Sequence, residues 1–373
     1  MTVPSAPSPR PSPAVDPAPH AAPSFSPAPP DAAGAPYPAP TGSAAPGPGP
    51  DGDGASVAAS GRRGSAPAPD EDVAALRDRH GDPTPRRMLR RLRGLLGDDA
   101  FPEAYERALG GCRLPVTTGR RVGVLSVDGG VGRSTLTAAV GLLLAAARAD
   151  AVSVVDMGPT PSGVAARLPE QVPVSSWRRL VADPTSPDRA AAGLHRSLGR
   201  AGSSLHLLDR DPDPTAPPAP AAEEVVLLHH LLARAFSVSV LELPPSAMPV
   251  PTTSLEQMHC LILVSGAAPS SAARTAEHLH RVRRHAPHVP ILPVVSATRP
   301  ATSTERRGAY DVLGAASGTA PLLVDHDRHL APGLPISLER IGEQRRLQLV
   351  ELAAAALSLA ASPGPRPAAQ ETR

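Results

Sequence analysis

Short, purely apolar runs alternate with longer runs of helical spacing through most of the chain, from residue 114 to about 362. The short runs are rich in Val, Ile and Leu, as strands buried on both faces of a parallel sheet are. This alternation predicts an α/β domain with a mostly parallel sheet sandwiched by helices. The expected strands are 122–127, 152–156, 205–208, 238–243, 260–265, 291–295 and 322–324. The expected helices are 134–148, 223–235, 270–285 and 338–360.

Residues 1–70 show neither pattern and consist largely of Pro, Ala, Ser and Gly. Such a composition offers too little apolar surface to offset the entropy of ordering, which predicts a disordered arm with polyproline II character. Two interpretations stay open: an arm that docks a protein partner, or a solubilising tail without a fixed partner. The Pro-containing end, 363–373, is expected to be a flexible tail.

Residues 71–113 are expected to form a short helical linker region. Within it, 86–96 places Met and Leu at helical spacing and Arg on the remaining faces, which predicts a basic amphipathic helix. Such a helix can bind an anionic membrane, nucleic acid or a protein partner. The favoured interpretation is plainer: the Leu face packs on the neighbouring domain and the Arg face is solvated.

A glycine-rich loop follows the first expected strand and leads directly into a helix. Its sequence is Asp-Gly-Gly-Val-Gly-Arg-Ser-Thr, residues 128–135. Glycines let the backbone approach phosphate oxygens, and the free amides at a helix N-terminus donate hydrogen bonds to them. The order of strand, glycine loop and helix therefore predicts a phosphate-binding loop.

Further motifs follow in a fixed order along the chain. Asp156-Met-Gly158 ends the second expected strand, and Glu242-Leu-Pro-Pro ends a later one. Ser296 ends a late strand, and "VDHDRHLAPGLPIS" forms a turn near the C-terminus. With the glycine loop, these motifs resemble those of the MinD/ParA-like ATPases, the deviant Walker A branch of P-loop proteins, over roughly residues 120–360.

The resemblance implies a site for ATP with Mg²⁺ and a nucleotide-dependent homodimer. It places Mg²⁺ at Ser134, Asp156 and Glu242 and catalysis at Asp156 and Glu242. The positions that it assigns to the nucleotide are Gly129, Gly130, Val131, Gly132, Arg133, Ser134, Thr135 and Ser296.

The chain departs from the family pattern at four positions that matter to the chemistry. Arg133 stands where the family carries the loop lysine, and Asp128 stands where it carries a second lysine. Gly158 lacks the carboxylate that helps to position the attacking water, and Glu242 is one methylene longer than the usual Asp. A negative charge beside the transferring phosphate opposes its stabilisation.

These departures predict an ATP-binding regulatory protein with weak or absent hydrolysis. The alternatives are a nucleotide-free pseudo-ATPase scaffold or an active ATP-dependent dimerisation switch of partitioning type. A Pro-rich N-terminus on such a degenerate domain also resembles proteins associated with type VII secretion in high-GC bacteria, which implies a role in spatial organisation or secretion.

Composition and charge also bear on the partners of the protein, its compartment and the state of its cysteines. The formal net charge is only +2, and none of the 37 basic residues is lysine, so the overall charge does not favour DNA or an anionic membrane. The basic run 278–285 is interpreted as a solvated face rather than a DNA contact. Neither a secretory signal nor a membrane-spanning run is present in the pattern, which predicts a cytoplasmic protein. The two cysteines are expected to be reduced, although one disulfide stays open, and Trp177 is expected in the core.

Overall fold

The computed structural model describes residues 100–158, 163–182, 187–201, 204–209, 221–244 and 252–362. The predicted arm at 1–70, the basic helix predicted within 86–96 and the tail at 363–373 lie outside these residues, and stay predictions.

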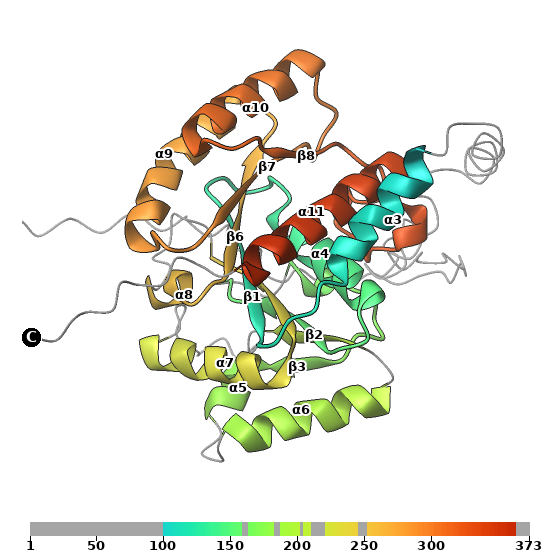
Figure 1. The fold of residues 1–373 in the computed structure, drawn as a ribbon, viewed down its shortest axis with the longest axis vertical. Coiled ribbons are helices and arrows are strands. Elements are labelled where there is room, and N and C mark those ends of the chain that lie inside the picture. Colours follow the sequence, from blue (N-terminus) through green and yellow to red (C-terminus); the bar gives the residue numbers. More distant parts are fainter. Residues whose placement is uncertain are drawn as a thin grey trace, which may run out of the picture. The chain divides into compact units, whose positions relative to one another are not determined.

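An eight-stranded sheet forms the centre of the described residues, and every neighbouring pair of strands is parallel. The strand order is β3-β4-β2-β5-β1-β6-β7-β8 (Figure 1). The strands are β1 (Arg120–Ser126), β2 (Val152–Asp156), β3 (Val174–Ser176), β4 (Leu205–Asp209), β5 (Val238–Glu242), β6 (Cys260–Gly266), β7 (Ile291–Ser296) and β8 (Leu322–Val324). The predicted α/β fold is confirmed.

The sheet order places β1 at the point where the connections between strands change direction across the sheet. From β1 the chain crosses to β2, which lies beyond β5, whereas β6, β7 and β8 extend the sheet on the other side. In open parallel sheets, a crevice for ligands opens at this switch point, outside the carboxyl ends of the strands. The glycine loop leaves the carboxyl end of β1 and therefore lies in that crevice.

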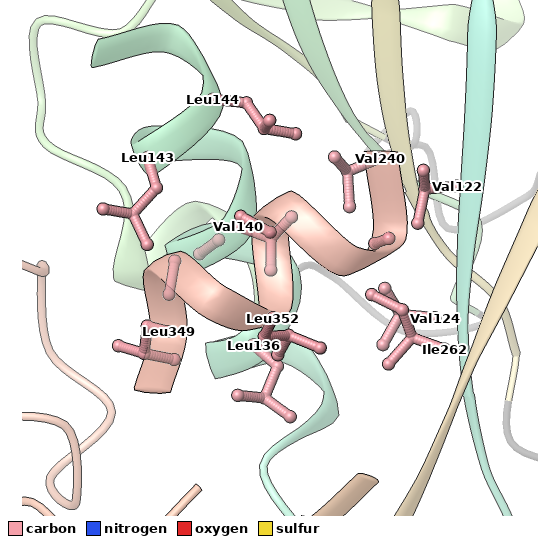
Figure 2. Close-up of a cluster of buried hydrophobic side chains, with 14 of the residues drawn as sticks. Val122, Val124, Leu136, Val140, Leu143, Leu144, Val240, Ile262, Leu349 and Leu352 are labelled. Carbon is pink, nitrogen blue, oxygen red and sulfur yellow. The ribbon is translucent and has the colours of Figure 1, made fainter. Parts of the chain in front are cut away.

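Helices α4 (Arg133–Ala147), α11 (Glu343–Ala361) and α3 (Ala100–Cys112) cover one face of the sheet. Valines at alternate positions of the central strands, such as Val122 and Val124, pack against leucines of α4 and α11 on this face (Figure 2). α3 lies along α11 and packs against it (Figure 1).

The opposite face is covered by α7 (Ala222–Ala235) and α9 (Pro269–His285), with α5 (Trp177–Ala182), α6 (Pro187–Ala201), α8 (Thr252–Glu256) and α10 (Ser303–Ser317) around them. The side chains of Leu125, Leu241 and Leu263 point from the central strands into this layer. Trp177 is only 1% exposed and lies in the same layer, which confirms its predicted place in the core.

Most predicted elements are present, but some boundaries and several short elements differ from the prediction. The helix expected at 338–360 is two elements, a 3-10 turn η2 (Leu338–Arg340) and α11, because the extended backbone of Gly342 separates them. The pattern of apolar positions did not predict β3, α6, α8 and α10. β3 is an edge strand of only three residues, and α6 carries few large apolar residues among many polar and small ones.

Both cysteines are buried free thiols, which agrees with the expected reduced state. Among the described residues, no helix combines the length and the apolarity that crossing a bilayer requires.

Candidate functional site

The glycine loop connects β1 to α4 with two glycines in the left-handed region, Gly130 at φ 73° and Gly132 at φ 92°. A Cβ at Gly129 or Gly130 would meet no atom of the described residues within 4 Å, so these residues leave the loop backbone open on that side. α4 begins at Arg133 without a side-chain cap. The first amides of a helix have no acceptor within the helix, so those of its first turn are available to an anion.

A pocket with a volume of about 310 Å³ lies over this loop. The glycine loop lines it on one side, and the residues that follow β7 and β8 line it on another. Ser296 at the end of β7 is close to the loop, because a Cβ on Gly132 would lie 3.1 Å from Ser296 Oγ. A second hollow of about 330 Å³ lies beside the same loop and contains Ser271 and Arg274 of α9.

Arg133 turns its guanidinium toward the end of β5. Its Nε donates to Glu242 Oε1 at 2.9 Å, and one terminal nitrogen donates to Ser126 Oγ at 3.1 Å. Ser134 Oγ donates to the same Glu242 oxygen at 2.7 Å. The Glu242 side chain is only 4% exposed, and its second oxygen, Oε2, is buried and has no hydrogen-bond partner in the part of the chain that the structure describes. One carboxylate oxygen thus holds the loop arginine and the loop serine together.

Arg167, from the 3-10 turn η1 (Ala165–Arg167), brings a second guanidinium to the pocket. Its Nε donates to Thr135 Oγ1 at 2.8 Å, and a terminal nitrogen donates to the carbonyl of Gly163. Burial lowers the pKa of Arg167, opposed in part by the charge of Glu242. Arg167 forms no direct ion pair among the described residues, and the charge of Glu242 acts on it only from a distance, so its guanidinium is available to an anion in the pocket.

Asp128 lines both hollows beside the loop, and residues of α9 bind its carboxylate. Arg274 donates two hydrogen bonds to its carboxylate, at 2.8 and 2.9 Å, and Ser271 Oγ donates a third at 2.5 Å. The hydrogen bond from Arg274 lowers the pKa of Asp128, and the Ser271 hydroxyl lowers it further against the effect of burial. The residue that replaces the family lysine is therefore an anion that is neutralised within its own chain.

The strand next to β5 ends in Asp156, whose register partner is Glu242. Asp156 Oδ1 accepts a hydrogen bond from the Gly158 amide at 2.7 Å, and its backbone carbonyl accepts one from the Trp177 indole at 2.9 Å. Asp156 is buried. This carboxylate is thus built into the turn that follows β2, and Gly158 supplies no second one.

The turn after β8 closes the far side of the pocket. Asp327 caps it by accepting from the amides of His329 and Gly342, and His329 Nε2 accepts from the Ser337 amide. The Ile336 amide donates to the Arg167 carbonyl at 2.9 Å, which ties this turn to η1. The "G-x-P" segment therefore borders the pocket through Arg167.

The structure brings together most of the residues that the sequence singled out. Gly129, Gly130, Gly132, Arg133, Ser134, Thr135 and Ser296 line the pocket. Val131 instead lies in the hydrophobic core beneath the loop. Glu242 joins the site through Arg133 and Ser134, and Asp156 lies on the neighbouring strand. The roles of these residues in binding and catalysis stay predictions.

Sequence reasoning missed Arg167 and Arg274, the two cations that contact the loop. Neither lies in a motif, and in a chain whose basic residues are all Arg nothing marks these two. Their places depend on how η1 packs against α4 and how α9 packs against β6, which no local pattern reveals.

The residues present fit a phosphate chain but not a magnesium ion in the usual place. Open glycine backbone, the start of α4, Arg133 and Arg167 together provide donors and positive charge for phosphate oxygens. The Ser134–Glu242 pair, which would hold the metal, is already joined to the guanidinium of Arg133. No group of three or more His, Cys, Asp or Glu side chains among the described residues is placed to hold a metal.

Comparison with known proteins finds no matching family model and no matching curated protein. Among solved structures, the chain is similar to a ParA family ATPase from Chlorobium tepidum TLS, at 18% identity over 63% of this chain and 98% of that one, with a TM-score of 0.48. It is also similar to the cell division ATPase MinD of Pyrococcus furiosus, at 16% identity over 62% of this chain and 97% of that one, with a TM-score of 0.48.

A third similar structure is the septum site-determining protein MinD complexed with Mg-ADP from Pyrococcus horikoshii OT3. It is 16% identical over 63% of this chain and 95% of that one, with a TM-score of 0.44. The structural neighbours are thus MinD/ParA ATPases at low identity. The sheet order and the glycine loop carry the fold assignment, since likeness at this level says nothing of activity.

Proposed function

We propose that this chain is a nucleotide-binding regulatory protein of MinD/ParA-like architecture that binds ATP and hydrolyses it slowly or not at all. The observation that supports this proposal most directly is the pocket of about 310 Å³ over the open glycine loop. The guanidinium groups of Arg133 and Arg167 line this pocket. Backbone amides at the start of α4 and charge-assisted hydrogen bonds from Arg133 and Arg167 would bind the phosphate oxygens.

Slow hydrolysis is supported by what surrounds the phosphate position. Catalysis of phosphoryl transfer depends on positive charge at the transferring group and on an oriented water. Asp128 contributes an anion already bound by Arg274, and Gly158 offers no side chain to orient water. Glu242 is engaged by Arg133 and Ser134, so it is not free to act as a base.

Binding is tested by calorimetric titration of the full chain with ATP. Arg133→Ala and Arg167→Ala are each expected to weaken binding by at least about tenfold, because each removes a charged donor from the pocket. Arg307→Ala is the matched control, since this arginine lies on the exposed face of α10 and its side chain is 84% exposed. Unchanged affinity in both pocket variants would contradict the proposed site.

Hydrolysis is tested by phosphate release from the wild type and from the triple variant Asp128→Lys/Arg133→Lys/Gly158→Asp. We expect the triple variant to turn over faster, because it restores two compact cations and a carboxylate that can position water. Equal turnover in the two proteins would instead favour the active dimerisation switch.

A nucleotide-free scaffold is the second candidate, and the contacts within the site favour it. Arg133, Ser134 and Glu242 satisfy one another, and Arg167 is bonded to Thr135, so a ligand must compete with these contacts. Absence of ATP binding to the wild type, together with a stable protein partner in cells, would establish this reading.

The wider role that we propose is spatial organisation or secretion in the cytoplasm, through protein partners. It rests on the resemblance of a Pro-rich N-terminus joined to a degenerate domain, as in type VII secretion-associated proteins. Partners would engage the Pro-rich arm at 1–70 or a dimer face. Deleting residues 1–70 and measuring partner capture separates these two routes, because only the first is lost with the arm.

A further inference from the structure

We infer that the site binds its nucleotide without magnesium, with the guanidinium groups of Arg133 and Arg167 supplying the positive charge that a metal ion would otherwise provide. This inference rests on the proposed function, because it concerns the form of the ligand at the same pocket. It departs from the expectation, drawn from the resemblance, that Ser134, Asp156 and Glu242 hold Mg²⁺.

The first observation is that the Glu242 carboxylate already has hydrogen-bond donors within the chain. Its Oε1 accepts from Arg133 Nε at 2.9 Å and from Ser134 Oγ at 2.7 Å. The guanidinium thus stands at the hydroxyl and carboxylate through which the loop would bind a cation. A lysine has a compact ammonium on a flexible stem, whereas the planar guanidinium is fixed by two contacts, to Glu242 and to Ser126.

The second step is the cost of adding a metal to this arrangement. Magnesium requires near-octahedral oxygen ligands at about 2.1 Å and gives up its water reluctantly. Glu242 Oε2 has no hydrogen-bond partner among the described residues, and an ion bound there would share a single carboxylate with Arg133. Two cations on one buried carboxylate repel each other strongly, since the surroundings screen charge less than water does.

The third observation is that Arg167 offers a positive charge to the phosphate groups of a nucleotide. Arg167 lies in the pocket, has no direct carboxylate partner among the described residues and bonds only uncharged oxygens, at Thr135 and Gly163. A desolvated guanidinium of this kind gains most from an anionic ligand, which it can bind in a bidentate manner. It is thus placed to accept the phosphate charge that magnesium would neutralise.

The experiment is calorimetric titration of the full chain with ATP, once in excess Mg²⁺ and once in EDTA. We expect dissociation constants that agree within about threefold. Binding in Mg²⁺ that weakens by about tenfold or more in EDTA would overturn the inference and leave the proposed function intact. Absence of binding in both conditions would overturn the proposed function itself, and the inference with it.

Two variants sharpen the result. Glu242→Gln removes the carboxylate charge that Arg133 and Ser134 share, and we expect this variant to bind ATP at least as tightly as the wild type in either condition. A loss of affinity in Mg²⁺ alone would show that a metal binds through Glu242 and would refute the inference.

Arg133→Lys is expected to make the affinity for ATP depend on Mg²⁺ by about tenfold, because a compact ammonium leaves room for the ion at Ser134 and Glu242. Arg307→Lys is the control for the exchange of Arg for Lys away from the site.

Discussion

The ion pair between Arg133 and Glu242 should couple the stability of the glycine loop to that of β5. The two side chains are 17% and 4% exposed, and their shortest contact is 2.9 Å. We consider Arg133→Met, which keeps the aliphatic stem, Glu242→Gln, which keeps the shape, and the double variant. In each single variant, the remaining member of the ion pair is still largely buried but no longer has an opposite charge beside it.

The magnitude follows from this burial. Two unit charges about 4 Å apart attract by about 4 kcal/mol at the effective dielectric constant of about 20 that suits protein sites. Partial exposure of Arg133 reduces this, so we expect a coupling free energy of about 2 kcal/mol. Arg133→Met alone should cost about 3 kcal/mol, because it leaves a buried carboxylate without its counter-ion. The double variant should be no less stable than Arg133→Met.

Urea unfolding of the full chain near pH 7, followed by the fluorescence of Trp177, measures all four proteins. Trp177 is the single tryptophan and is buried, so its emission reports the loss of the core. Arg307 and Asp311 provide a control cycle, because this pair is 3.8 Å apart and exposed, and should couple by less than about 0.5 kcal/mol. Additive effects of the Arg133 and Glu242 substitutions would refute the reasoning, since independent sites do not couple.

Three further predictions follow from the packing and the charges. Gly141→Ala should destabilise the protein by about 1–3 kcal/mol in urea unfolding, because a Cβ there would overlap the side chain of Val154. The two thiols should react with a thiol reagent only after unfolding, since burial raises the pKa of Cys112 to about 11 and that of Cys260 to about 12; rapid labelling of the native protein would contradict this. Asp128→Asn should destabilise the protein at neutral pH, but progressively less as the pH falls below about 4. The native pKa of Asp128 lies below its ordinary value, so its stabilising contribution is present above that value and is lost on acidification; a stability difference that is constant down to pH about 2 would refute it.

The sequence by itself determined the architecture and the position of the glycine loop. Continuous Val- and Leu-rich runs alternating with helical periods mark a parallel sheet, because strands buried on both faces leave no polar alternation. Gly130 and Gly132 could be recognised as loop glycines, since a left-handed backbone strongly favours glycine. The departures at Asp128, Arg133 and Gly158 were equally visible in the linear order of residues.

Only the tertiary structure decided what those departures do. Arg133 meets Glu242 across 109 positions of sequence, and Asp128 meets Arg274 across 146, because parallel strands bring distant carboxyl ends to one edge of the sheet. Arg167 reaches Thr135 for the same reason, from a 3-10 turn with no sequence signature. Propensity and periodicity act over a turn or a strand, whereas charge pairing acts through space, so the electrostatics of the site emerge only once the sheet has formed.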